Sequence, residues 1–199
     1  MDRTPAGGGA IIISMETHLP NGRVLKLLQG DITRVPADAI VNAANSALRG
    51  GGGVDGAIHR AGGPAIMREL DQIRDVSGGC PTGRVVATTA GDLPAKYILH
   101  AVGPVYRGGT HGEAELLASC YRMAMQMAAE RGVRTINFPS ISTGVYGYPV
   151  EEAAPIALRA VGEALAGDTP VETATFVLFD RGTFEAYERA LAALPTPLQ

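Results

Sequence analysis

The sequence lacks features that several classes of protein require. It has no apolar run of 18 residues, so no segment reads as a membrane-spanning helix. Its two cysteines, Cys80 and Cys120, cannot form the framework of a disulfide-rich domain. The opening stretch, MDRTPAGGG, lacks the pattern of a signal peptide. These absences predict a soluble, cytoplasmic protein with no membrane partner.

A large excess of charge of one sign is also absent. Lys and Arg number 17 and Asp and Glu number 20, which gives a formal net charge of −3. Without an overall basic field the chain is not expected to bind duplex nucleic acid, and any nucleotide should be a small ligand or a chain terminus. With 199 residues, 46% of them hydrophobic, the chain can bury a sizeable core. We predict one domain over residues 10–199 after a disordered tail at residues 1–9.

Several catalytic motifs are missing as well. The sequence contains neither the phosphate-binding pattern G-x-x-x-x-G-K-[ST] nor the serine-hydrolase pattern G-x-S-x-G. Gly51, Gly53 and Gly56 match G-x-G-x-x-G, but about eight residues separate them from the preceding strand, which excludes the tight turn of a Rossmann dehydrogenase. The histidines and cysteines show no metal-ligand spacing. We therefore expect chemistry by added water, without a metal, a cofactor or a covalent nucleophile.

Hydrophobic periodicity predicts alternating strands and helices. Strands are expected at residues 10–14, 23–28, 37–42, 84–89, 96–102, 134–139 and 173–179. Helices are expected at residues 64–73, from about 113 to 131, from about 150, and at the end of the chain. This order favours an α/β fold, with one mixed sheet covered by helices on both faces.

Three positions carry expectations of their own. Residues 110–113 fit a capping box that starts the second long helix. Pro155 implies that the next helix either begins late or is kinked. His100, between apolar residues of a strand, is expected to be a hydrogen-bonded core histidine and not a catalytic one.

The chain is organised around residues 40–63, which contain four consecutive glycines, Gly50 to Gly53. A glycine inside a helix costs about 1 kcal/mol relative to alanine, so this run is predicted to be a loop. Its bare amides, followed by a helix N-terminus, suit a phosphate or diphosphate. Asp55 and His59 follow, four residues apart and so on one face of a helix. Alone, Asp55 would be interpreted as a helix cap and His59 as a packed or solvated helix residue. Together, beside this loop, they indicate a catalytic site.

Polar side chains follow two of the predicted strands. Asp31 comes directly after one strand, where open α/β sheets hold ligands, although alone it would be a turn aspartate. Asn42 is expected to satisfy the backbone of the glycine loop, which is a structural role. Asn45 is closer to the glycines and could bond a ligand hydroxyl.

A second loop, SISTGVYGYP at residues 140–149, repeats this layout between a strand and a helix. The hydroxyls of Ser142 and Thr143 and the amides near Gly144 are gathered there, beside Tyr146. Two such loops in one sheet could grip a diphosphate from both sides. At the end of the last strand, Phe179 or Phe184 could stack on an adenine, although each is as readily an ordinary core residue.

Six motifs, in this order and at these separations, resemble a macrodomain of the MacroD type: GDIT, VNAAN, GGGGVDGAIHRAGG, CPTG, YILHAVGP and SISTGVYGYP. The resemblance covers residues 23–194. It implies a three-layer α/β/α macrodomain with a central mixed β-sheet that binds ADP-ribose. It also implies hydrolysis of mono-ADP-ribosyl esters, both ADP-ribosylated Asp or Glu on proteins and O-acetyl-ADP-ribose. The alternative is a reader module that binds ADP-ribose without turnover.

The resemblance also implies roles for individual residues. Asp55 would be the catalytic aspartate, assisted by Asn45 and His59. Asp31 would accept the adenine amino hydrogens beside the backbone of Ile32. The implied ADP-ribose site comprises Asp31, Ile32, Asn45, Gly51, Gly52, Gly53, Val54, Asp55, Ser142, Thr143, Gly144, Val145, Tyr146, and Phe179 or Phe184. The glutamate pair of the poly(ADP-ribose) glycohydrolase branch is absent, so cleavage of ribose–ribose bonds is not expected.

Overall fold

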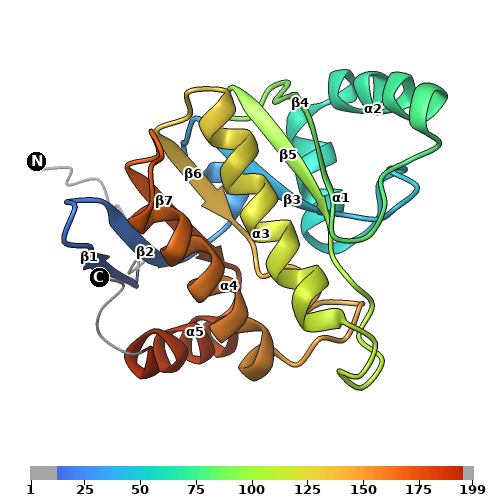
Figure 1. Cartoon of the computed structure of the whole chain (residues 1–199). Coiled ribbons are helices and arrows are strands. Elements are labelled where there is room, and N and C mark those ends of the chain that lie inside the picture. Colours follow the sequence, from blue (N-terminus) through green and yellow to red (C-terminus); the bar gives the residue numbers. More distant parts are fainter. Residues whose placement is uncertain (1–12, 195–199) are drawn as a thin grey trace, which may run out of the picture.

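The computed structural model describes residues 13–194, and a seven-stranded mixed sheet forms its centre (Figure 1). The strand order is β1-β2-β7-β6-β3-β5-β4. The five inner strands run parallel, and β1 and β4 pair antiparallel at the two edges. The strands are β1 (Ser14–His18), β2 (Val24–Gln29), β3 (Ala39–Ala44), β4 (Val85–Thr89), β5 (Tyr97–Val102), β6 (Thr135–Phe138) and β7 (Thr173–Leu178).

Helices pack on both faces of this sheet, which confirms the predicted three-layer α/β/α class. One face is covered by α1 (Gly53–Gly62) and α2 (Pro64–Ser77), and the other by α3 (Glu113–Glu130), α4 (Val150–Ala166) and α5 (Arg181–Ala193). A short 3₁₀ helix, η1 (Ile32–Arg34), follows β2. Successive strand residues point to opposite faces, so Ile40 of β3 packs under α1 and α2 whereas Val41 packs under α3 to α5. β3 is therefore buried on both faces.

The second face holds the larger core. Tyr121 of α3, Phe138 of β6, Phe176 of β7 and Tyr187 of α5 form a chain of aromatic contacts with ring centroids 5.2–5.8 Å apart. All four side chains are fully buried. Their packing joins two helices to the neighbouring strands β6 and β7, from whose ends two segments of the candidate site emerge.

The predicted elements occur in the predicted order, with corrections at the first strand, the third helix and Pro155. Most of the strand expected at residues 10–14, like the tail at 1–9, lies outside the described residues. The observed β1 starts at Ser14 and pairs antiparallel with β2. α4 begins at Val150, where the helix was expected, with Pro155 inside it, so of the two alternatives for Pro155 the late start does not occur.

The capping box expected at residues 110–113 does not form. Gly112, at φ 76°, is the N-cap of α3 and has no side-chain cap. The carboxylate of Glu113 instead accepts the N–H groups of Arg107, Gly109 and His111 from the preceding loop. Among the described residues, no helix combines the length and apolar character needed to cross a bilayer.

Candidate functional site

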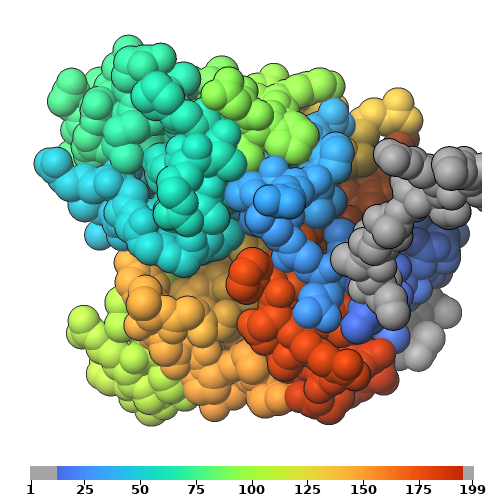
Figure 2. All heavy atoms as spheres, turned by 180° about the vertical axis from the view of Figure 1, so that it is seen from behind, coloured from blue at the N-terminus to red at the C-terminus, as the bar shows by residue number. Residues whose placement is uncertain are grey.

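A cleft of about 690 Å³ opens at the carboxyl ends of the parallel strands. Figure 2 shows this hollow between the teal loop before α1, the orange loop after β6, the red-orange segment after β7 and the blue segment after β2. Open α/β sheets hold ligands at this edge because the loops that follow the strands converge there. Of the residues expected in the site, the following line the cleft: Asp31, Ile32, Asn45, Gly51, Gly52, Gly53, Val54, Asp55, Ser142, Thr143, Gly144, Val145, Tyr146 and Phe179.

The first glycine loop forms one wall of the cleft. Gly50 and Gly53 have φ of 77° and 55°, values that favour glycine, and Gly52 is the N-cap of α1 without a side-chain cap. The N–H groups of residues 51–54 have no acceptor within the described chain. Gly56 lets this loop pass over α1, because a Cβ there would lie 2.5 Å from the carbonyl oxygen of Gly51.

The second loop forms the opposite wall. Ser142 has φ of 67°, a left-handed conformation that costs energy in a residue other than glycine. Thr143 donates its hydroxyl to Ser140, and the N–H groups of residues 143–146 have no acceptor in residues 13–194. Gly103, of the YILHAVGP motif, lies so close to Ser142 that a Cβ would collide with its Oγ. Both walls of the cleft thus present free main-chain donors.

Asp55 lies in the first turn of α1 and is held from behind. Only 6% of the residue is exposed, and its Oδ1 accepts a hydrogen bond of 2.7 Å from Nδ2 of Asn42. The Nε2 atom of His59 lies 3.3 Å from the same oxygen. Its other oxygen, Oδ2, adjoins Gly51, where a Cβ would lie 3.3 Å from it. One carboxylate oxygen is therefore fixed in the interior while the other faces the loop that rims the cleft.

The role in the loop backbone that was expected of Asn42 is filled by Asn45. Asn45 lines the cleft, but its side chain serves the loop backbone: Nδ2 donates to the carbonyl of Gly50 and Oδ1 accepts the N–H of Arg49. Asn42 is fully buried and bonds Asp55, so the expectation that it satisfies the loop backbone is wrong. Position relative to the strand end explains the difference: Asn42 is still inside β3, whereas Asn45 follows it.

Asp31 is partly exposed, with 39% of its side chain accessible. Its Oδ1 accepts hydrogen bonds from both N–H and Oγ1 of Thr33, which is the local turn bonding considered as the alternative role. Its Oδ2 lies 3.7 Å from the exposed Arg34. Because Asp31 also lines the cleft, turn formation and ligand contact are compatible.

The structure separates the two candidate aromatic residues. Phe179 follows β7 at the cleft and is 81% exposed. Phe184 is 3% exposed and packs in the core beneath α5, away from the residues that line the cleft, so its place in the expected site is corrected. The physical reason is helical spacing, because residue 184 falls on the inward face of α5 with Tyr187.

Arg60 was not expected in the site, yet it is the single cationic side chain among the residues that line the cleft. Gly53, Ala57 and Arg60 share one face of α1 at spacings of four and three residues, and this pattern was the available signal. The cleft also contains three aspartates, Asp31, Asp55 and Asp180. With one cation against three carboxylates, main-chain amides are the principal donors for an anion.

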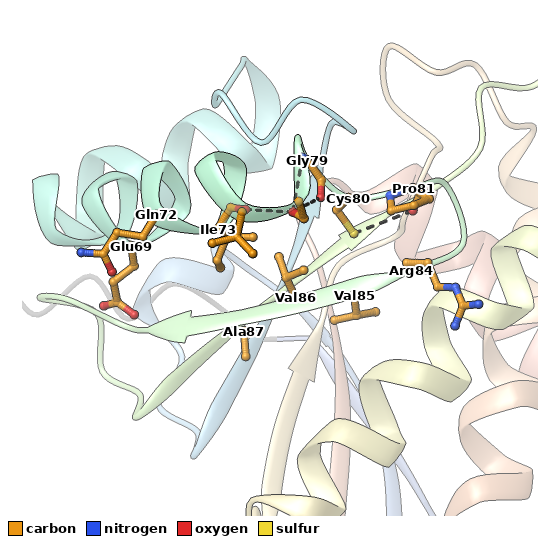
Figure 3. A pocket seen from close by; sticks show the side chains of 12 residues that line it. Glu69, Gln72, Ile73, Gly79, Cys80, Pro81, Arg84, Val85, Val86 and Ala87 are labelled. Atoms are coloured by element: carbon orange, nitrogen blue, oxygen red, sulfur yellow. Dashed lines mark hydrogen bonds between the residues drawn. The ribbon is translucent and has the colours of Figure 1, made fainter.

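A second hollow of about 580 Å³ lies between α2 and the edge strand β4 (Figure 3). Its lining includes Ile73, Cys80 and Val86, together with Glu69 and Arg84 at its ends, and none of the residues expected in the site. Within residues 13–194, no group of three or more His, Cys, Asp or Glu side chains could hold a metal ion.

The fold and the cleft define an α/β protein with a cleft of free main-chain N–H groups at the carboxyl edge of a mixed sheet. The chain belongs to the macrodomain family: the family model described as "Macro domain" matches residues 41–157. It is 52% identical over 170 residues to the O-acetyl-ADP-ribose deacetylase of Klebsiella pneumoniae (strain 342), which covers 85% of this chain and 97% of that protein. These matches confirm the macrodomain resemblance read from the six motifs.

Solved structures agree with this assignment. The Oceanobacillus iheyensis macrodomain with ADP superposes with a TM-score of 0.87 at 40% identity, covering 93% of this chain and 98% of that one. The Trypanosoma brucei macrodomain in complex with ADP-ribose gives a TM-score of 0.76 at 40% identity, covering 84% of this chain and 68% of that one.

Proposed function

We propose that this macrodomain binds ADP-ribose and hydrolyses mono-ADP-ribosyl esters, both on aspartate and glutamate side chains of proteins and in O-acetyl-ADP-ribose. The observation that carries the proposal is the pair of facing loops: residues 51–54 and 143–146 present N–H groups that have no acceptor in the described chain, beside the fixed carboxylate of Asp55. A relative named O-acetyl-ADP-ribose deacetylase and macrodomains bound to ADP and ADP-ribose support it.

A diphosphate suits the space between these loops. Each phosphate oxygen accepts hydrogen bonds from amides that would otherwise lack a partner, and the N-terminus of α1 adds its positive dipole end. Phosphate charge held in this way needs few cations, which agrees with the single arginine of the cleft.

The two ends of the cleft suit the two ends of ADP-ribose. At one end, Phe179 offers an exposed ring for an adenine and Asp31 a carboxylate for its amino group, next to Ile32. At the other end, Asp55 and Asn45 both lie close to Gly51, next to the expected position of the distal ribose. His59 contacts Asp55 and does not line the cleft, so we assign it an effect through Asp55.

The proposed reaction adds one water molecule across the ester. The ester C–O bond breaks, the hydroxyl and the remaining hydrogen of water are divided between the two fragments, and the products are a free carboxylic acid and ADP-ribose. A fixed carboxylate that accepts hydrogen bonds from the water and the ribose supplies positioning and electrostatic stabilisation. We assign this role to Asp55, with a ligand phosphate assisting. We further propose that the chain acts in the cytoplasm as one domain over residues 10–199.

The proposal is tested by incubating the full chain with O-acetyl-ADP-ribose and, separately, with a protein mono-ADP-ribosylated on acidic residues. Release of acetate and of ADP-ribose is expected in excess over a reaction without enzyme. Calorimetry with ADP-ribose measures binding independently of turnover. Binding without any turnover of either substrate would instead establish a reader module, and the absence of binding would refute both functions.

A further inference from the structure

A row of buried polar side chains lies behind Asp55 and takes no part in lining the cleft. Asn42 of β3 and His100 of β5 are fully buried, and Thr88 of β4 is 4% exposed. Three adjacent strands thus place one polar residue each on the sheet face beneath α1: Asn42 pairs in register with His100, and Thr88 lies two residues along β4 from Val86, the register partner of His100. Polar groups removed from water are costly unless they are hydrogen-bonded, so the arrangement of these bonds matters.

The donors and acceptors that each group carries determine the direction of the hydrogen bonds in the row. Asn42 Nδ2 carries two hydrogens, and it lies 2.7 Å from Oδ1 of Asp55 and 3.1 Å from Nδ1 of His100. A reversed amide would set a carbonyl oxygen against the carboxylate, so Nδ2 donates to both. Nδ1 of His100 is then an acceptor, and the ring proton is on Nε2, which donates over 2.9 Å to Oγ1 of Thr88. The Thr88 hydroxyl donates in turn to the carbonyl oxygen of Thr89.

This arrangement requires His100 to be neutral. Burial, reinforced by the neighbouring His59 and opposed by Asp55, lowers the pKa of His100 to about 3. The ring therefore stays uncharged at neutral pH, with a free acceptor for Asn42. A protonated ring would present a hydrogen at Nδ1, so the Asn42 amide could no longer donate to it.

We propose that His100 is a positioning residue for Asp55. Fixed in its Nε2–H form by Thr88, it orients the Asn42 amide, which donates to Oδ1 of Asp55 and leaves Oδ2 facing Gly51 and the cleft. Only one placement of the hydrogens satisfies the hydrogen bonds of this row, so the row holds the Asp55 carboxylate in one orientation. The effect of His100 on turnover rests on the proposed hydrolase function. Its effect on the orientation of the Asp55 carboxylate does not depend on that function.

Two substitutions at His100 separate positioning from mere packing. His100→Leu keeps the bulk and removes the acceptor, whereas His100→Asn keeps an acceptor oxygen close to the former Nδ1. We expect kcat for O-acetyl-ADP-ribose to fall about tenfold in His100→Leu with KM nearly unchanged, and to recover to within about threefold of wild type in His100→Asn. Equal losses in both variants, or a loss confined to KM, would overturn the proposal.

The matched control is Asn137→Leu on β6. Asn137 is 3% exposed, its Nδ2 donates to the carbonyl of Val35, and it does not line the cleft. Asn137→Leu should lower the melting temperature as His100→Leu does, because each variant removes a buried hydrogen-bonding group. It should leave kcat unchanged. A tenfold loss of kcat in this control would attribute the His100 effect to general destabilisation and so refute the proposal.

Two further measurements need no catalysis. Nitrogen-15 NMR of histidine-labelled protein should show His100 as the neutral Nε2–H form from pH 5 to 8, with its signals assigned by their loss in His100→Asn. Crystal structures should show the Asp55 carboxylate rotated or in several orientations in His100→Leu and unchanged in His100→Asn. An Nδ1–H ring, or an unchanged carboxylate in His100→Leu, would overturn the proposal. If wild type hydrolysed neither substrate, the proposed function would fail while these two measurements still decided the role of His100.

Discussion

Two aspartates line the same cleft but differ in their exposure and in the residues that hold them. Asp55 is 6% exposed, and its Oδ1 is bonded to Asn42, which lies within the sheet. The side chain of Asp31 is 39% exposed, and its Oδ1 is bonded to the turn of which it is part. The first is held by tertiary structure and the second by its own local sequence.

This difference in exposure and bonding indicates that the two ends of the cleft have different functions. A buried carboxylate with a fixed orientation suits a step in which atoms must be placed accurately, because misplacement by about 1 Å can cost a hundredfold in rate. An exposed carboxylate keeps its water until a ligand arrives and suits recognition by hydrogen bonding. The comparison therefore predicts that changes near Asp55 act on kcat, and changes near Asp31 on affinity.

The largest effect is expected from Asp55→Ala. Loss of the positioned carboxylate should lower kcat for O-acetyl-ADP-ribose by about a thousandfold, in the range typical of such groups. Binding of ADP-ribose should change only a few-fold, since main-chain amides hold the diphosphate. Steady-state kinetics and calorimetry measure the two quantities. Full turnover in Asp55→Ala would show that this end of the cleft is not catalytic.

Gly56→Ala tests the loop beside Asp55 without changing either aspartate. The new Cβ would press on the carbonyl oxygen of Gly51, 2.5 Å away, and displace the glycine loop. We expect kcat/KM to fall roughly a hundredfold. Gly167→Ala is the matched control, because residue 167 has an extended backbone at φ −81° and its Cβ would meet nothing closer than 3.5 Å. Similar kinetics in the two variants would contradict the role given to this loop.

Asp31→Ala should affect binding alone. Removal of one charged hydrogen bond should weaken ADP-ribose affinity by about 1–3 kcal/mol, while kcat at saturating substrate stays close to wild type. Calorimetry gives the affinity. An unchanged affinity would remove Asp31 from the adenine end, and a reduced kcat with unchanged affinity would reverse the comparison.

The smallest effect on turnover is expected from Glu113→Gln, which separates burial from function. Glu113 is 2% exposed but lies outside the cleft. Burial alone would raise its pKa, but backbone N–H groups of its own residue, His111, Arg107 and Gly109 outweigh that and hold the pKa at about 2. The variant should melt at a lower temperature than wild type at pH 7, with unchanged kcat. Impaired turnover would mean that any buried carboxylate matters as much as Asp55.

The difference in melting temperature between wild type and Glu113→Gln should depend on pH, because the fold lowers the pKa of Glu113. The pKa of Glu113 is lower in the folded chain than the ordinary value of 4.5 that it has in the unfolded chain. Its contribution to stability is therefore complete above that value and is lost as the pH falls toward 2. The gap in melting temperature between wild type and Glu113→Gln should narrow over this interval. A constant gap would contradict the shift.

Much of the fold could be read from sequence because its signals are local. The unbroken apolar run of β3, the period of α3 and the glycines of the first loop each reflect a local preference, and each element appears where it was expected. The extent of the first strand to residue 18 was not predicted, because residues 14–18 form an edge strand that alternates between exposed and half-buried residues and so gives a weak hydrophobic signal. Glu113 was misread because the left-handed turn at Gly112, and not the capping pattern, starts α3.

The sequence by itself determined the strand order in the chain, the two loops rich in free amides and the presence of an acid and a histidine four residues apart. Only the tertiary structure decided that Asn42 bonds Asp55, that Phe179 lies at the cleft while Phe184 is in the core, and that Arg60 lines the cleft. The physical reason is the separation in sequence between the residues that determine each feature. Backbone conformation depends on neighbouring residues, whereas the partner of a side chain such as His100, 58 residues from Asn42, is set by which strands lie side by side in the sheet.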